Sequence, residues 1–343
     1  MQLYTHARAI TLGAACLGTG VFLVLNLPLP FLMGPLTACL LFAVAGAKLE
    51  GMGVIGTAMR TILGIAISAS ITPNTLSALP GFAPTLVLVP LFVGVIGLVG
   101  FPFFHKLLGF DRATSFYAAM PGGLQDMLVF GEEAGGDVRA MSLIHATRVL
   151  AIVATAPFVI AWIWDIDLTA APGAPASAVG WGQIAIMAAS GLAGWKIAER
   201  VGLFGASILG PMILTAALSL TGVIQSRPPA EMIWAAQFFI GLSVGAKYVG
   251  ITPREIRVDI GAGLGYAVLL TLISLGFLWI AVQISGADTL DMALSFLPGG
   301  QGEMVVVAII AGADLSFVVT HHLMRLFTVI LLAPILGARL TKG

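Results

Sequence analysis

The sequence predicts an all-α polytopic membrane protein, and three observations carry this prediction. Charged side chains make up only 9% of the 343 residues, against roughly 25% in an average soluble domain. Apolar residues make up 59% of the chain, and the mean hydropathy is +1.04. Four runs without Asp, Glu, Lys or Arg each reach the roughly 20 residues that a helix needs to cross a bilayer; they are residues 9–47, 61–104, 201–226 and 260–287. These runs are apolar on every face, whereas the strands of a membrane barrel alternate polar and apolar residues.

The chain also contains an internal repeat, which bears on its architecture. Residues 120–127 read MPGGLQDM and residues 297–304 read LPGGQGEM, at an offset of 177. Four further pairs recur at this offset: Asp111 with Asp288, Asp137 with Asp314, His145 with His322, and Arg148 with Arg325. We therefore expect two homologous membrane repeats, residues 1–163 and 181–343, joined by a linker over 164–180 that is rich in alanine and proline.

Each repeat is expected to contain about six helical segments, which gives about 10–12 transmembrane segments in all. They lie near residues 9–27, 31–47, 54–71, 83–104, 113–135 and 138–163, and near 181–198, 203–223, 231–248, 258–284, 290–312 and 315–338. The fifth segment of each repeat contains Pro-Gly-Gly, where proline removes a backbone donor and glycine lowers helix propensity. We expect both helices to be broken there, with the freed backbone groups facing protein or water.

Two arguments about the orientation of the repeats conflict. Six crossings per repeat would make the repeats parallel. The basic residues at segment ends, such as Lys106, Arg254 and Arg257, fit the cytoplasmic side together only if the second repeat is inverted. Inversion requires an odd number of crossings, which half-crossings at 31–47 or 181–198 would provide. We favour inversion, because broken helices in inverted repeats are a recurrent transporter design.

Charge and composition argue against several classes of protein. The net charge of zero offers no basic face for nucleic acid. Cys16 and Cys39 both fall inside apolar runs, which fits neither a disulfide framework nor a metal cluster. No phosphate-binding loop and no pair of histidines at the spacing of a zinc site is present. We therefore expect neither an enzyme nor an ATP-driven pump, no cofactor and no metal, and an uncleaved first helix.

Several motifs together resemble a known family. Pro-Gly-Gly followed by an acid, then Gly-Asp (136–137) or Ala-Asp (313–314), then His and Arg in the next segment, resembles the AbrB membrane family, whose members carry this unit twice. The resemblance covers essentially the whole chain. The stretch GLSVGAKYVGITPREI (241–256) and the Pro-Gly-Gly unit are also similar, more weakly, to the bile acid:sodium symporter group. That similarity implies a helical fold with discontinuous helices that cross near the membrane midplane.

Two acids follow the expected breaks at matching positions, Asp126 and Glu303. A carboxyl group at membrane depth binds a proton more readily because burial disfavours its charged form, so both acids are candidates for proton or ion coupling. The alternative is that they are first-turn acids stabilised by the helix dipole.

Each sixth segment carries a histidine and an arginine three residues apart, His145 with Arg148 and His322 with Arg325. This spacing places both side chains on one helical face. The pairs are candidates for ion coupling, and for countering an anionic substrate or the acids Asp126 and Glu303. Alternatively, they are structural and form ion pairs that hold the broken and unbroken helices together.

The Pro-Gly-Gly motifs are the candidate substrate-binding elements, because half-helix starts present free backbone N–H groups to an anion. The residues are Pro121, Gly122, Gly123 and Gln125 in the first repeat, and Pro298, Gly299, Gly300 and Gln301 in the second. The simpler interpretation is that the glycines only let two helices approach closely. Asp137 and Asp314 are expected to cap the sixth segments.

Together these features predict a secondary active transporter in the cytoplasmic (inner) membrane. A small organic anion, coupled to protons or another ion, is the candidate substrate. A channel, or a membrane scaffold or regulatory protein without transport activity, is the alternative. The expected partners are the lipid bilayer and a small-molecule substrate, with a homodimer as an open alternative and no nucleic acid.

Overall fold

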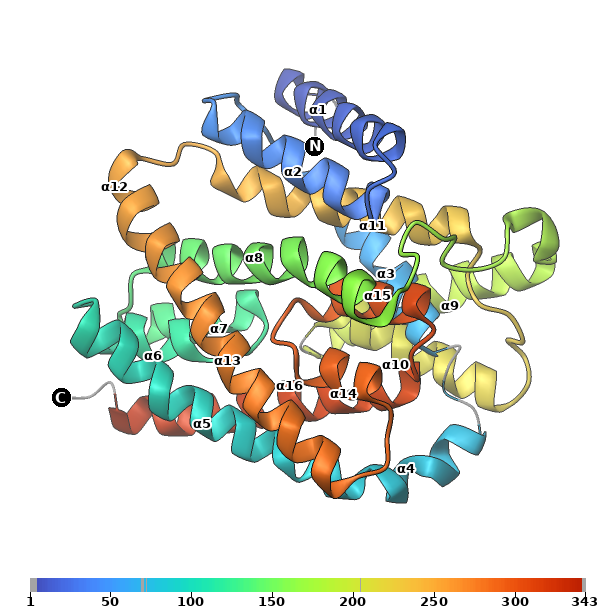
Figure 1. Cartoon of the computed structure of the whole chain (residues 1–343). Helices are drawn as coiled ribbons and strands as arrows, with labels where there is room; N and C mark the ends of the chain where they lie inside the picture. Colours follow the sequence, from blue (N-terminus) through green and yellow to red (C-terminus); the bar gives the residue numbers. More distant parts are fainter. Residues whose placement is uncertain (1–4, 69–70, 72, 204, 341–343) are drawn as a thin grey trace. The chain divides into compact units, whose positions relative to one another are not determined.

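The chain folds into α-helices joined by short loops (Figure 1). The structure is a computed structural model that describes residues 5–68, 71, 73–203 and 205–340, and no β-strand occurs among them. Five stretches of the described chain are long and apolar enough to cross a membrane: His6–Val24, Ser77–Leu107, Val138–Trp164, Pro253–Ile284 and Leu315–Leu340. The protein is therefore a multi-pass, all-helical membrane protein, as predicted. The total of about 10–12 transmembrane segments stays a prediction.

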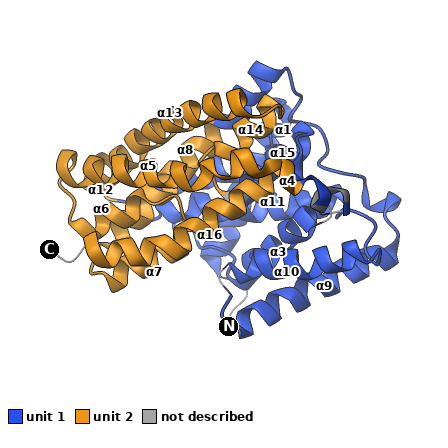
Figure 2. Ribbon diagram, turned by 90° about the horizontal axis from the view of Figure 1, so that it is seen from below, with its two compact units in different colours: residues 1–78, 156–251, 302–316 blue, residues 79–155, 252–301, 317–343 orange. Residues whose placement is uncertain are grey.

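The helices form two compact units, coloured separately in Figure 2. Unit 1 consists of residues 1–78, 156–251 and 302–316, and unit 2 of residues 79–155, 252–301 and 317–343. Each unit draws helices from both halves of the sequence. The units therefore differ from the predicted division at 164–180, which describes sequence similarity rather than packing and stays a prediction.

Unit 1 is built mainly from the first three helices of each half. These are α1 (His6–Val24), α2 (Pro30–Val44) and α3 (Val54–Ser68), then α9 (Trp181–Arg200), α10 (Ala206–Leu220) and α11 (Ala230–Gly245), followed by the short η3 (Ala246–Tyr248). Helix α15 (Gln301–Ala311) joins this unit. Helix α2 has 15 residues, so it rises about 22 Å, less than the roughly 30 Å hydrocarbon core of a bilayer.

Glycine pairs allow close helix crossings in unit 1. A Cβ atom built on Gly34 of α2 would lie 2.6 Å from the carbonyl oxygen of Gly18 in α1. A Cβ atom built on Gly194 of α9 would lie 2.5 Å from the carbonyl oxygen of Gly210 in α10. Both crossings need residues without a side chain, which is typical of helix packing in membranes.

The third helix of each half packs against the second helix of the other half. Gly64 of α3 lies directly on the backbone carbonyl of Ile208 in α10, and Gly241 of α11 lies directly on the carbonyl of Leu32 in α2. Helices of the two halves therefore alternate within unit 1, and each third helix packs against a helix of the other half.

Unit 2 is built mainly from the later helices of each half. From the first half come most of α4 (Pro73–Leu86), α5 (Leu88–Pro102), the π-helical η1 (Phe103–Leu107), α6 (Arg112–Ala119), α7 (Leu124–Glu133) and most of α8 (Val138–Trp164). From the second come α12 (Pro253–Glu255), the π-helical η4 (Ile256–Ile260), α13 (Gly261–Ile284), α14 (Thr289–Phe296) and most of α16 (Leu315–Leu340). A short 3₁₀ turn, η2 (Ala176–Ala178), lies in the predicted linker.

Aspartates fix where the helices of the later segments begin. The carboxylate of Asp137 accepts a hydrogen bond from Ala140 N at 3.0 Å, and that of Asp314 accepts one from Ser316 N at 2.9 Å. Such side chains satisfy amide groups that a helix start leaves free. The prediction that Asp137 and Asp314 cap the sixth segments is confirmed.

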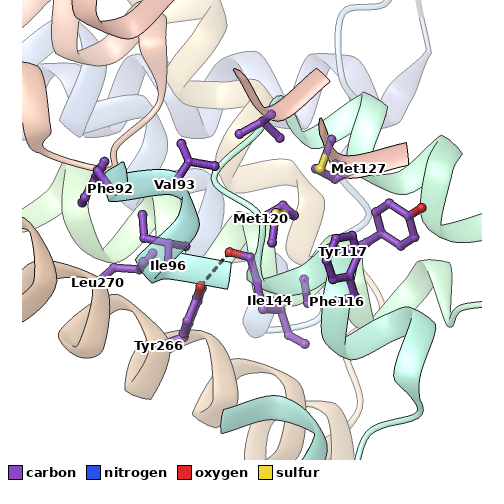
Figure 3. Packing of buried hydrophobic residues seen from close by; sticks show 14 of the residues in the cluster. Phe92, Val93, Ile96, Phe116, Tyr117, Met120, Met127, Ile144, Tyr266 and Leu270 are labelled. Atoms are coloured by element: carbon purple, nitrogen blue, oxygen red, sulfur yellow. Dashed lines mark hydrogen bonds between the residues drawn. The ribbon is translucent and has the colours of Figure 1, made fainter. Parts of the chain in front are cut away.

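The core of unit 2 is aromatic and lies between α5, α6, α13 and α14. Figure 3 shows Phe92 and Ile96 of α5 beside Tyr266 and Leu270 of α13. The Phe92 ring meets the ring of Phe296 in α14 edge-on at 5.6 Å, an arrangement that aromatic pairs favour. This packing fixes the ends of the broken helices that form the candidate site.

Both predicted breaks are present. Helix α6 ends at Ala119 and α7 begins at Leu124, whereas α14 ends at Phe296 and α15 begins at Gln301. The fourth segment differs most from its predicted bounds, since it begins at Pro73 as α4 rather than near residue 83. Proline suits a first helical turn, where its missing N–H group has no partner to lose.

Candidate functional site

Side chains from neighbouring helices satisfy the carbonyl end of the first broken helix. The last carbonyl groups of a helix have no partner within the helix. At the end of α6, the His145 Nε2 atom lies 3.0 Å from Tyr117 O, and Arg148 Nη1 donates to Met120 O at 3.2 Å. The Tyr266 hydroxyl group donates to Ala119 O at 2.6 Å, drawn as the dashed line in Figure 3. Helix α6 therefore ends on three buried side chains.

The second broken helix ends in the same way, 177 residues later. The His322 Nε2 atom lies 3.0 Å from Leu294 O, and Arg325 Nη1 donates to Leu297 O at 3.1 Å. Leu297 directly precedes Pro298, as Met120 precedes Pro121. Because a carbonyl oxygen only accepts hydrogen bonds, both histidines carry a hydrogen on Nε2. The His–Arg pairs thus connect the unbroken sixth helices to the ends of the broken fifth helices, all within unit 2.

Both arginines are buried without an acid beside them. Arg148 is 4% exposed and Arg325 is 6% exposed. Neither arginine takes part in the ion pairs Arg8–Glu50, Arg139–Glu255 and Lys196–Glu199 of the described residues. The Nε atom of Arg148 has no hydrogen-bond partner. Unit 2 therefore holds two buried positive charges that the described acids do not neutralise by contact.

The Pro-Gly-Gly residues lie in the loops between the half-helices. Gly123 caps α7 without a side-chain hydrogen bond, and in the first turn of α7 the Asp126 carboxylate accepts a hydrogen bond from the N–H group of its own residue. A Cβ atom built on Gly122 would lie 2.9 Å from Val329 Cγ1 in α16. Gly122 thus also serves close packing, as the simpler interpretation expected. In the second motif Pro298 and Gly299 are buried and Gly300 is half-buried.

For two candidate substrate-binding residues the structure describes the backbone but not the side chain. Gln125 and Gln301 stand in the first turns of α7 and α15, but their side chains lie outside the described residues. Their assignment to the substrate site stays a prediction.

The two candidate coupling acids belong to different units. Asp126 stands in the first turn of α7 in unit 2, and Glu303 in the first turn of α15 in unit 1. Both side chains are half-buried. Their expected position in one polar cavity stays a prediction.

Sequence reasoning assigned no role to three residues that the structure places beside the candidates. Tyr266 bonds the end of α6, and Lys247 in η3 lies within electrostatic range of both Arg60 and Glu303 in unit 1. Arg60 and Lys247 are isolated basic residues within the predicted segments 54–71 and 231–248, and such charges in apolar segments are the signal that could have found them. Among the described residues, no three His, Cys, Asp or Glu side chains lie close enough to hold a metal ion.

The helices and the two breaks define the class as a multi-pass membrane protein with discontinuous helices. The family described as "Transition state regulatory protein AbrB" matches residues 31–341. The chain therefore belongs to the AbrB family, as its paired Pro-Gly-Gly units predicted. The weaker resemblance to the bile acid:sodium symporter group stays an expectation.

Two relatives illustrate the range of the similarity. "Uncharacterized protein YhjN" of Bacillus subtilis (strain 168) is 29% identical over 246 residues, which cover 65% of this chain and 62% of that protein. "Putative regulator AbrB" of Escherichia coli (strain K12) is 25% identical over 321 residues, which cover 91% of this chain and 90% of that protein. The chain thus matches less than two thirds of the length of the first relative and nearly all of the second.

Proposed function

We propose that this protein is a secondary active transporter of a small organic anion in the cytoplasmic membrane. The observation that carries the proposal is the pair of helices broken at Pro-Gly-Gly, each with its carbonyl end bonded by a buried arginine, Arg148 or Arg325. Backbone groups freed at membrane depth are tolerated only beside protein or a water-filled cavity. Secondary transporters place substrate and coupling ions at such breaks.

The proposal includes an internal duplication. The His–Arg contacts recur at an offset of 177, and the two glycine crossings of unit 1 recur at an offset of 176, from Gly18 to Gly194 and from Gly34 to Gly210. Two halves with one ancestral fold account for both recurrences. We further propose that the halves are inverted in the membrane, on the distribution of basic residues.

The parts of the site have distinct roles in this proposal. The Pro-Gly-Gly loops supply amide groups to the substrate, and Arg148 and Arg325 position these loops through the preceding carbonyl groups. The positive charge of the arginines also favours an anion in the surrounding unit. Asp126 and Glu303 bind and release the coupling proton.

A role as a membrane scaffold or regulator is the second candidate, because one relative is named as a regulator. A channel is the third. A chain that only regulates would bind a partner without moving solute, and a channel would conduct solute without coupling it to an ion gradient.

The proposal is tested by reconstituting the full chain into liposomes and imposing an inward proton gradient. Uptake of radiolabelled acetate, lactate and succinate is measured against protein-free liposomes. We expect saturable uptake of at least one carboxylate that falls when the gradient is abolished with an ionophore. Uptake equal to that of protein-free liposomes for all three would overturn the proposal in favour of a scaffold or regulator.

A further inference from the structure

Three charged side chains of unit 1 come together from distant parts of the sequence. Arg60 lies on α3, Lys247 in η3 and Glu303 on α15, and Lys247 lies within electrostatic range of both others. All three side chains are half-buried, so the cluster is partly shielded from its surroundings.

Helix packing explains why these residues meet. A Cβ atom built on Gly56 of α3 would lie 3.5 Å from Ser243 Oγ of α11, which brings the end of α11 and the following η3 beside α3. A Cβ atom built on Gly302 would lie 2.9 Å from Leu63 Cδ1 of α3. The first turn of α15, with Glu303, therefore lies on α3 close to Arg60.

The cluster has an excess of positive charge. It contains two cations and one carboxylate, and within the described residues none of the three takes part in an ion pair shorter than 4 Å. A charge that is partly removed from water requires a counter-charge. One further anion would balance the cluster. Arg148 and Arg325 differ, because they already donate to backbone carbonyl groups.

The matching positions of the other half carry no such cations. At the offset of 177, Arg60 corresponds to Gln237 and Glu303 to Asp126, and residues 64–73, which match the stretch around Lys247, contain no Lys or Arg. Gln237 is 1% exposed, and its amide nitrogen has no hydrogen-bond partner. The basic pair is thus specific to one half of the chain. Gln237 also suggests Arg60→Gln as a test variant, because glutamine already occupies the matching position of the other half.

We propose that Arg60 and Lys247 bind the carboxylate group of the transported anion, and that Glu303 is the counter-charge they hold when no substrate is bound. This assignment rests on the proposed function, since it locates the substrate of that transporter. Guanidinium and ammonium groups both bind carboxylates, the first through paired donors and the second as a point charge. The ligand class is a small mono- or dicarboxylate.

The test is equilibrium binding by the purified full chain in detergent, which does not depend on transport. Thermal shifts are recorded during titration with acetate, lactate and succinate at constant ionic strength, because a ligand of the folded state raises the apparent stability. The variants are Arg60→Gln, which copies Gln237 of the other half, Lys247→Ser and Glu303→Gln. Lys106→Ser, at an exposed lysine of unit 2, is the matched control.

The direction in which each variant changes the affinity for the carboxylate decides the outcome. We expect the wild type and the control to bind alike, Arg60→Gln and Lys247→Ser each to weaken binding at least about tenfold, and Glu303→Gln to tighten it because the competing charge is gone. A purely structural cluster would not tighten binding on loss of Glu303. If Arg60→Gln fails to fold, the opposite effects of the other two variants still decide.

Two results would overturn the assignment: no shift of the wild type with any of the three carboxylates, or variants that bind like the wild type. Binding with the expected signs but no uptake by liposomes would refute transport while leaving this site in place. Uptake that is unaffected by Arg60→Gln and Lys247→Ser would refute the site and leave transport in place.

Discussion

The hydroxyl group of Tyr266 offers the sharpest test of how the broken helix is held. It donates to the carbonyl oxygen of Ala119, the last residue of α6, at 2.6 Å, and both residues are fully buried. Tyr266→Phe keeps the ring and its packing but leaves this carbonyl group without a partner. A buried unsatisfied acceptor costs about 1–3 kcal/mol. The corresponding decrease in Tm is roughly 1.5–4 °C for a chain of 343 residues.

The assay is thermal unfolding of the purified protein in detergent, followed by intrinsic fluorescence. Thr155→Val is the matched control, because Thr155 is exposed and its hydroxyl group bonds only carbonyl groups of its own helix, Ala151 O at 2.8 Å and Ile152 O at 3.4 Å. The control should change the free energy of unfolding by no more than about 0.5 kcal/mol. A Tyr266→Phe variant whose Tm stays within about 1 °C of the wild type would refute the capping role.

Three further predictions concern the arginines, the helix crossings and the coupling acids. Arg148→Lys and Arg325→Lys should each lower the free energy of unfolding by about 1.5–3 kcal/mol, because lysine cannot reproduce the guanidinium contact with the carbonyl group. Unfolding of the variants in detergent measures this loss, and wild-type stability of both variants would contradict the prediction. Gly34→Ala should destabilise unit 1 by about 1–3 kcal/mol through overpacking. Gly20→Ala is the control and should be neutral or stabilising, because a Cβ atom built on Gly20 meets no other atom within 4 Å. Equal Tm values of the two variants would refute the close crossing of α1 and α2. Asp126→Asn should flatten the pH dependence of liposome uptake, and an unchanged pH profile would exclude Asp126 as the coupling group.

Local features of the fold could be predicted from the sequence because their causes are local. Pro-Gly-Gly breaks a helix wherever it stands, and the helices do end at Ala119 and Phe296. An aspartate before an apolar run caps the next helix, as Asp137 and Asp314 do. The spacing of His145 and Arg148 placed both on one helical face, and both contact the same broken helix.

The partners of these residues could not be predicted, because they depend on which helices pack together. The two arginines were expected to meet an acid or an anion, but each donates to a carbonyl group 28 residues earlier in the chain. Tyr266 is separated from Ala119 by 147 residues. The cluster of Arg60 and Lys247 with Glu303 likewise depends on the packing of α3, α11 and α15, of which the sequence shows only isolated glycines.

Counterflow in reconstituted liposomes tests the central claim, carrier-mediated transport of a small anion, most directly. Liposomes are loaded with an excess of the unlabelled carboxylate that is taken up fastest, and a trace of the labelled compound is added outside. A carrier exchanges label for unlabelled substrate, so we predict a transient accumulation of label above its equilibrium level that is lost in Arg60→Gln. A monotonic approach to equilibrium, or a flux equal to that of protein-free liposomes, would contradict the account.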